Sequence, residues 1–202
     1  LLENKIEILE NNILSAEAAP VSVRNILNNP RIHGVHNTIG KLLDIPEKYV
    51  IATDIALGAS SNYLVVDDDN LALSAIDFLK ERKLGRATFY PLNVIKSKYV
   101  SSDIINDIKN INGYIGVLSD LVRYDKKYKN IVENRLGQVI VVDNERTLNI
   151  IGKLINYKYV VVSLDGEILN VGGSITGGTS KKNSMLNEKN ELNKLKNDLQ
   201  KL

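Results

Sequence analysis

The strongest constraint on the fold is an internal repeat. A Lys-Tyr pair precedes a Leu-Gly pair by nine residues at two places, and a β-branched run ending in Val-Val-Asp follows each Leu-Gly pair. Leu57-Gly58 recurs as Leu136-Gly137, and Val65-Val66-Asp67 recurs at a slightly shorter interval as Val141-Val142-Asp143. A helical stretch and another strand follow each copy, so the sequence predicts two related halves, roughly 30–110 and 113–180. Strands that alternate with helices predict an α+β fold of mixed α/β layers, in which each half has a β-sheet and packed helices.

Both ends of the chain show the spacing of a coiled-coil seam. Apolar residues recur every three or four positions among polar ones: Leu2, Ile6, Leu9 and Ile13 at one end, and Leu192, Leu195, Leu199 and Leu202 at the other. Helices this short are marginal alone, so we expect the two ends to pair with each other or to be parts of longer arms. Two amphipathic helices packed on the domain are the alternative. The expected organisation is a coiled-coil stub at 1–19, subdomains at 20–111 and 112–180, and a second stub at 181–202.

Local signals place the elements of the globular part. Asp69 or Asn70 is expected to cap a helix that ends before Gly85. A strand is expected over 87–90, closed by Pro91. Asp165-Gly166 predicts a hairpin between strands at 160–164 and 167–171.

Composition excludes several classes of function. The chain has 202 residues, no cysteine, two histidines, and 26 basic against 24 acidic residues. Disulfides, thiol catalysis and Cys-ligated zinc are therefore excluded, and a His-rich metal site is impossible. The net charge of +2 leaves room only for local basic patches. No apolar run is long enough to span a membrane, and no signal peptide is visible. Because the chain starts inside one helical pattern and ends inside another, we interpret it as a piece of a longer protein.

The most unusual segment is Gly-Gly-Ser-Ile-Thr-Gly-Gly at 172–178. Its spacing does not match the phosphate-binding P-loop or the dinucleotide fingerprint. Glycine pairs also permit two backbones to approach closely, for example when a segment joins the edge of another chain's sheet. A third interpretation is a flexible turn into the final helix. The residues alone leave close approach, a turn and phosphate binding open.

Other motifs favour structural roles. The Asp-Asp-Asp-Asn run at 67–70 lacks the glycine and distal glutamate of an EF-hand, so helix capping is the better interpretation. His33 and His36 have no cysteine or third histidine to complete a metal site. No Gly-x-Ser-x-Gly elbow is present. We therefore predict no catalytic, metal or cofactor residues.

Basic residues gather in short runs, and most of these are typical of a solvated face. Lys181-Lys182 differs because it lies where the glycine-rich segment meets the final helix. Lysines there could contact phosphates without reading base sequence.

These motifs together resemble the hinge domain of bacterial-type SMC (structural maintenance of chromosomes) proteins. The resemblance spans about 30–180, and its most specific element is the glycine-rich segment. It rests on the following stretches: Ile32–Val35, Ile55–Gly58, Gly85–Leu92, Leu136-Gly137, Val141–Asp143, Leu164–Gly166 and Gly172–Gly178.

The resemblance implies a dimerisation module of a chromosome-organising ATPase whose heads lie outside this chain, so we expect no enzyme activity here. It implies a ring-like homodimer with interface residues Gly172, Gly173, Gly177 and Gly178, whose joint replacement by alanine should leave a folded monomer. It also implies weak, non-specific DNA contact near Lys181 and Lys182. Other complex subunits would bind the absent heads, and the protein would be cytoplasmic on the nucleoid. A nucleic-acid-binding module in which dimerisation is incidental is the alternative.

Overall fold

The computed structural model describes residues 1–17, 19–179 and 181–202, and the side chains of 1–11, 19–179 and 191–202. The chain divides into two compact units, which we describe separately. One comprises Pro20–Gly177, and the other comprises Leu1–Ala19 with Gly178–Leu202. In the described part of the chain, no helix is both long and apolar enough to cross a membrane.

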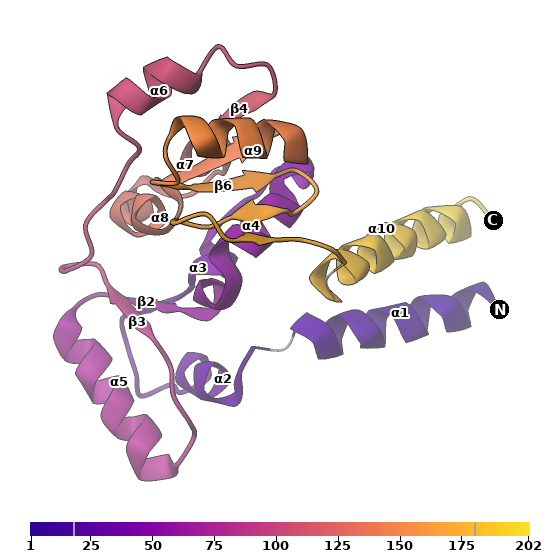
Figure 1. Ribbon diagram of the computed structural model, residues 1–202. Helices are drawn as coiled ribbons and strands as arrows, with labels where there is room; N and C mark the ends of the chain where they lie inside the picture. The colour runs from indigo at the N-terminus through magenta and orange to yellow at the C-terminus, as the bar shows by residue number, and fades with distance from the viewer. Residues whose placement is uncertain (18, 180) are drawn as a thin grey trace. The chain divides into compact units, whose positions relative to one another are not determined.

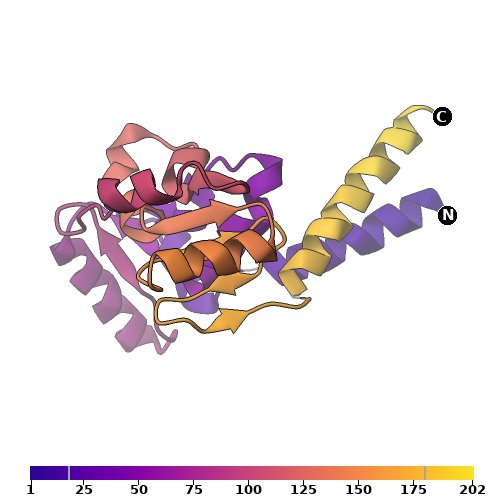
Figure 2. The same cartoon turned by 45° about the horizontal axis from the view of Figure 1, so that its top comes forward.

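The smaller unit pairs the two ends of the chain. Helices α1 (Leu2–Glu17) and α10 (Lys181–Gln200) lie side by side and run in opposite directions (Figures 1 and 2). Ile6 and Leu192 are buried between them, and four further seam residues pack around this pair: Leu2, Leu9, Leu195 and Leu199. Lys196 Nζ lies 2.6 Å from Glu10 Oε1 beside the seam. The two seams therefore face each other, which is one of the two arrangements expected; the side chain of Ile13 lies outside the described residues.

The larger unit begins with a three-stranded half (Figure 1). Strand β1 pairs antiparallel with β2, and β2 pairs parallel with β3. The elements of this half are α2 (Val21–Leu27), β1 (Val35–Thr38), α3 (Ile39–Leu42), η1 (Glu47–Tyr49), α4 (Val50–Leu57), η2 (Gly58–Asn62), β2 (Leu64–Val66), α5 (Asp69–Arg82) and β3 (Phe89–Pro91).

The second half has a five-stranded sheet in the order β4-β5-β6-β7-β8. Only β5 and β6 are parallel neighbours among its strands. Its elements are α6 (Ser102–Ile108), β4 (Tyr114–Val117), α7 (Leu118–Leu121), η3 (Lys126–Tyr128), α8 (Lys129–Leu136), β5 (Val139–Val142), α9 (Glu145–Leu154), β6 (Val160–Ser163), β7 (Ile168–Leu169) and β8 (Ile175–Thr176).

The two halves repeat one succession of elements, which confirms the predicted α+β fold with two related parts. The order β1-α3-η1-α4-β2-α5-β3 recurs as β4-α7-η3-α8-β5-α9-β6. Even the irregularities recur, since the register of the antiparallel pair shifts after Val35 in one half and after its repeat equivalent, Tyr114, in the other. The helix after the central strand is capped by Asp68 in one half and by Asn144 in the other.

Two local predictions need correction. The cap of α5 is Asp68, whose side chain accepts from the Leu71 N–H at 2.7 Å, and not Asp69 or Asn70. Asp68 has extended backbone, as a cap requires, while Asp69 is already the first helical residue. The strand expected over 87–90 covers 89–91, because its ladder with β2 starts at Phe89 and continues through Pro91.

Among the described residues of the larger unit, two hydrophobic clusters show how the halves pack. The first draws on both halves: Ile39, Ala52, Leu57 and Val65 from one, and Leu118, Val122, Tyr128, Ile131, Val132, Leu136, Val139, Val141 and Val162 from the other. The second lies under α9 on the five-stranded sheet and takes in Val100 and Ile108. Helix α6 therefore packs with the second half, although the expected division at 111/112 groups it with the first.

Direct polar contacts also join the halves. Asp44 and Arg123, which occupy equivalent positions of the repeat, exchange main-chain hydrogen bonds of 2.8 Å in each direction. Because each residue bonds its own counterpart, this bridge lies on a local two-fold axis. Off the axis, His36 Nδ1 lies 2.8 Å from the Tyr128 hydroxyl, and His36 Nε2 lies 2.6 Å from Asp67 Oδ1. His36 thus connects β1 to the second half.

Candidate interaction edges

The glycine-rich segment forms a hairpin with β7. The Asn170 N–H donates to the Ser174 carbonyl at 2.8 Å, and the Gly173 N–H donates to the Asn170 carbonyl at 3.0 Å. The Gly172 N–H donates to the Tyr157 carbonyl at 3.0 Å, which anchors the turn to the connection between α9 and β6. The turn residues 170–174 thus lead into β8, the last strand of the sheet.

Three of the four predicted interface glycines have a conformational reason inside the chain. Gly172, Gly173 and Gly178 have φ values of +92°, +111° and +105°, which residues with a Cβ rarely adopt. Gly177 differs, since a Cβ there would lie 3.2 Å from Glu167 Cγ. The segment is therefore an ordered turn and strand, and the glycines do not need a partner chain to explain them.

Strand β8 presents an open edge to its surroundings. Ile175 is 58% exposed, and the adjoining Val171 is 63% exposed. Since alternate residues of a strand direct their main-chain groups to opposite sides, the groups of Ile175 point away from β7. Among the described residues, no strand pairs with that side of β8.

Strand β3 presents a second open edge, at the end of the smaller sheet. The Leu64 N–H donates to the Thr88 carbonyl and the Leu92 N–H to the Val66 carbonyl, each at 2.9 Å, so the main-chain groups of Phe89 face away from β2. Pro91 has no N–H to leave unpaired there, which suits an edge strand. In the second half the equivalent strand, β6, is covered by β7. The smaller sheet has no counterpart of β7 and β8 in the described chain.

The two lysines predicted to contact DNA lie at the start of the last helix. Helix α10 begins at Lys181, but the side chains of Lys181 and Lys182 lie outside the described residues. The described residues contain no group of three or more His, Asp or Glu that could hold a metal ion.

The sequence did not single out β3 as an interaction edge. The repeat held the signal, because the chain after Pro91 lacks a second hairpin of the kind that follows Ser163.

Comparison with known proteins identifies the family. The family described as SMC proteins Flexible Hinge Domain matches residues 32–150. The Chromosome partition protein Smc of Bacillus subtilis (strain 168) is 38% identical over 164 residues, which cover 80% of this chain and 14% of that protein. The chain therefore spans about a seventh of the length of that relative.

Solved structures agree with this match. An asymmetric dimer of the Geobacillus stearothermophilus SMC hinge domain aligns over 99% of this chain and 81% of that chain, with a TM-score of 0.80 and 33% identity. The Pyrococcus furiosus SMC protein hinge domain aligns over 88% of each chain, with a TM-score of 0.66 and 30% identity. This chain belongs to the SMC hinge domain family, as its motifs predicted. As a hinge domain, it is not catalytic.

Proposed function

We propose that this domain is the dimerisation hinge of a chromosome-partition SMC protein, and that two copies join head to tail. The β8 edge of one copy adds to the β3 edge of the other. Two-fold symmetry makes both contacts equivalent and closes a ring. The observation that carries the proposal is that β3 ends the smaller sheet and β8 ends the larger one, each with main-chain groups that face away from its neighbouring strand.

The repeat supports this pairing of edges. In the second half, the strand equivalent to β3 has an antiparallel neighbour in β7. A β8 strand from a second copy would take that vacant position beside β3 and extend the smaller sheet by main-chain hydrogen bonds. The exposed side chains of Val171 and Ile175 would become buried in the same contact. The G. stearothermophilus relative, described as a hinge dimer, adds support.

The best test removes one outward hydrogen-bond donor from β8. The substitution Ile175→Pro deletes an N–H that faces away from β7, so the hairpin keeps its own bonds while the edge loses its donor. We expect molar mass by light scattering on a sizing column to fall from that of a dimer to that of a single chain. Circular dichroism should show an unchanged fold.

The matched control is Ile175→Val, which keeps the N–H and a β-branched side chain and should remain dimeric. An Ile175→Pro protein that dimerises with unchanged affinity would contradict the β8 contact. Joint replacement of the four glycines by alanine is a less specific test, because positive φ at three of them would strain the turn with or without a partner.

DNA contact is a second part of the proposal. Lys181 and Lys182 at the start of α10 support weak binding to phosphates. Such binding should be independent of base sequence and should weaken steeply with salt. Reversing the charge of Lys181 and Lys182 should reduce binding of a duplex and of a single strand, measured by fluorescence anisotropy; unchanged binding would remove both residues from the site. A monomer that binds DNA tightly would favour the alternative of a nucleic-acid-binding module.

The wider setting follows from the same proposal. ATP hydrolysis and contacts with other complex subunits would belong to the heads of the longer SMC protein. The protein would act in the cytoplasm on the nucleoid.

A further inference from the structure

The two halves differ at one place where the first half has an extra segment. Between α4 and β2 the chain forms η2, whereas only Gly137 and Gln138 connect α8 to β5. Segment η2 packs on α3, where Ser61 lies against Gly40 so closely that a Cβ on Gly40 would lie 2.3 Å from Ser61 Oγ. In the second half, α7 is the equivalent of α3, and no such segment lies between α8 and β5.

A hollow of about 380 Å³ lies over α7. Its lining comes from α7, the loop after it, η3 and the first residue of α8: Ser119, Asp120, Val122, Arg123, Tyr124, Lys126 and Lys129. Ser119 is the repeat equivalent of Gly40, the residue that η2 covers in the first half. The hollow therefore borders the α7 residue that corresponds to the α3 residue under η2.

Ser119 carries a polar group that the described chain does not satisfy. The residue is 2% exposed, and its Oγ has no hydrogen-bond partner among the described residues. A buried hydroxyl without a partner costs free energy, which a bound acceptor or donor would recover. Tyr124 supplies a second hydroxyl, and burial is the main cause that raises its pKa.

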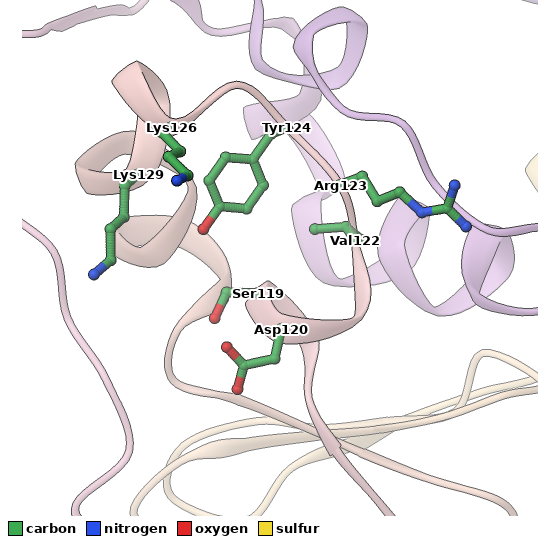
Figure 3. Close-up of a pocket in the computed structure, with 7 residues that line it drawn as sticks. All are labelled: Ser119, Asp120, Val122, Arg123, Tyr124, Lys126 and Lys129. Atoms are coloured by element: carbon green, nitrogen blue, oxygen red, sulfur yellow. The ribbon is translucent and has the colours of Figure 1, made fainter.

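Charge divides the hollow into two ends (Figure 3). The lysines 126 and 129 lie beside the Tyr124 ring, Asp120 lies on the far side of Ser119, and Arg123 points away from Ser119. Lys129 Nζ is 3.8 Å from Glu133 Oε1, and the Lys129 side chain is 66% exposed whereas that of Glu133 is 15% exposed. Asp120 accepts a hydrogen bond from the Tyr99 hydroxyl. An occupant would therefore place negative charge toward the lysines and hydrogen-bond donors toward Asp120.

The fold does not require these basic residues. The positions of Lys126 and Lys129 correspond to Glu47 and Val50 in the first half, where the same backbone forms with an acidic and an apolar residue. Arg123 corresponds to Asp44. The basic character of the hollow is thus a property of the second half alone.

We propose that this hollow binds a short acidic turn from a partner protein, seated on α7 as η2 is seated on α3. A peptide turn supplies main-chain N–H groups for Asp120, a hydroxyl or carbonyl for Ser119, and a carboxylate for the lysines. A bare phosphate satisfies the lysines but meets the Asp120 carboxylate with like charge, so the geometry favours a peptide over a nucleic-acid backbone.

The test uses a peptide patterned on η2. It carries residues 58–62 with Asn62→Asp and two further aspartates at its C-terminus, and it is titrated into the ¹⁵N-labelled domain. We expect shifts confined to the amides of α7, the following loop and η3. The substitution Lys126→Glu, which installs the residue found at the equivalent position of the first half, should weaken binding at least tenfold.

Lys127→Glu is the matched control, because it makes the same charge change on the neighbouring residue. Lys127 does not line the hollow, and its Nζ lies 5.2 Å from the centre of the Tyr128 ring. This variant should bind the peptide within twofold of the parent. The proposal is overturned if the peptide causes no shifts at millimolar concentration, or if both variants weaken binding equally. It is also overturned if inorganic phosphate or a thymidine 20-mer shifts these amides and the peptide does not.

Discussion

The two halves of the larger unit share a fold, and each has a segment that the other lacks. The first half has η2 but no hairpin after β3, while the second half has β7 and β8 but no segment between α8 and β5. Each omission leaves a surface uncovered: an open strand edge at β3 in the first case and a hollow over α7 in the second. The repeat thus supplies the fold, and the departures from it supply the candidate sites.

The largest expected effect tests whether the halves are one cooperative unit. Leu57 and Leu136 are repeat equivalents, 3% and 0% exposed, in the cluster that both halves share. Truncation of either to alanine should lower the free energy of unfolding by about 2–5 kcal/mol. In urea denaturation followed by circular dichroism and tyrosine fluorescence, both variants should shift a single common transition. Two separate transitions, each moved by only one variant, would mean that the halves unfold independently.

A smaller effect tests the difference at η2. Gly40→Ala places a Cβ against Ser61 and should cost about 1–3 kcal/mol by overpacking, since η2 must move. Adding Ser61→Ala removes the hydroxyl in closest contact and should restore most of that loss. At the equivalent position, Ser119→Ala should be nearly neutral, because the hydroxyl that it removes has no partner among the described residues. Thermal melts check this ranking of the variants by stability. A destabilised Ser119→Ala protein would show that the Ser119 hydroxyl has a hydrogen-bond partner.

The smallest expected effect concerns alkaline pH and the second half alone. Burial is the main cause that raises the pKa of Tyr99, Tyr114 and Tyr124, and the Asp120 carboxylate adds to it in each case. Their stabilising contribution is present below the ordinary tyrosine pKa of about 10 and is lost as pH rises through the higher folded values. The residues equivalent to Tyr114 and Tyr124 in the first half are Val35 and Ile45, which do not ionise.

Stability should therefore fall above a pH of about 10, and Tyr99→Phe should reduce the slope of that fall. Urea midpoints across the alkaline range, with tyrosinate absorbance as the titration readout, give the measurement. Tyr90→Phe is the control, because it removes a tyrosine of β3 in the first half. If stability falls with the same slope in Tyr99→Phe and in the parent protein, the raised pKa of Tyr99 does not contribute to the alkaline loss of stability.

Much of the fold could be predicted from sequence because the repeat marks it twice. Val-Val-Asp marks the strand that has one antiparallel and one parallel neighbour in each sheet, and Asp165-Gly166 marks the β6–β7 hairpin. Sequence reasoning places the cap of α5 one or two residues late, because a run of three aspartates offers several carboxylates and only backbone geometry selects Asp68. The packing of α6 on the second sheet depends on long-range contacts of Val100 and Ile108, which no local pattern reports.

The candidate sites were harder to predict for a related reason. The glycine-rich segment is conspicuous, and the sequence located one open edge through it. The other edge, at Phe89, and the hollow at Ser119 are defined by what is absent beside them. An absence becomes visible only when the two halves are compared element by element.

The bridge between Asp44 and Arg123 has a consequence for how the two halves can vary in sequence. Each residue bonds its own repeat equivalent through main-chain atoms, so the contact is self-complementary and independent of side-chain identity. Two separate copies of a single half could make the same contact with each other. The bridge is therefore a contact between the halves that tolerates any pair of side chains, here an aspartate and an arginine.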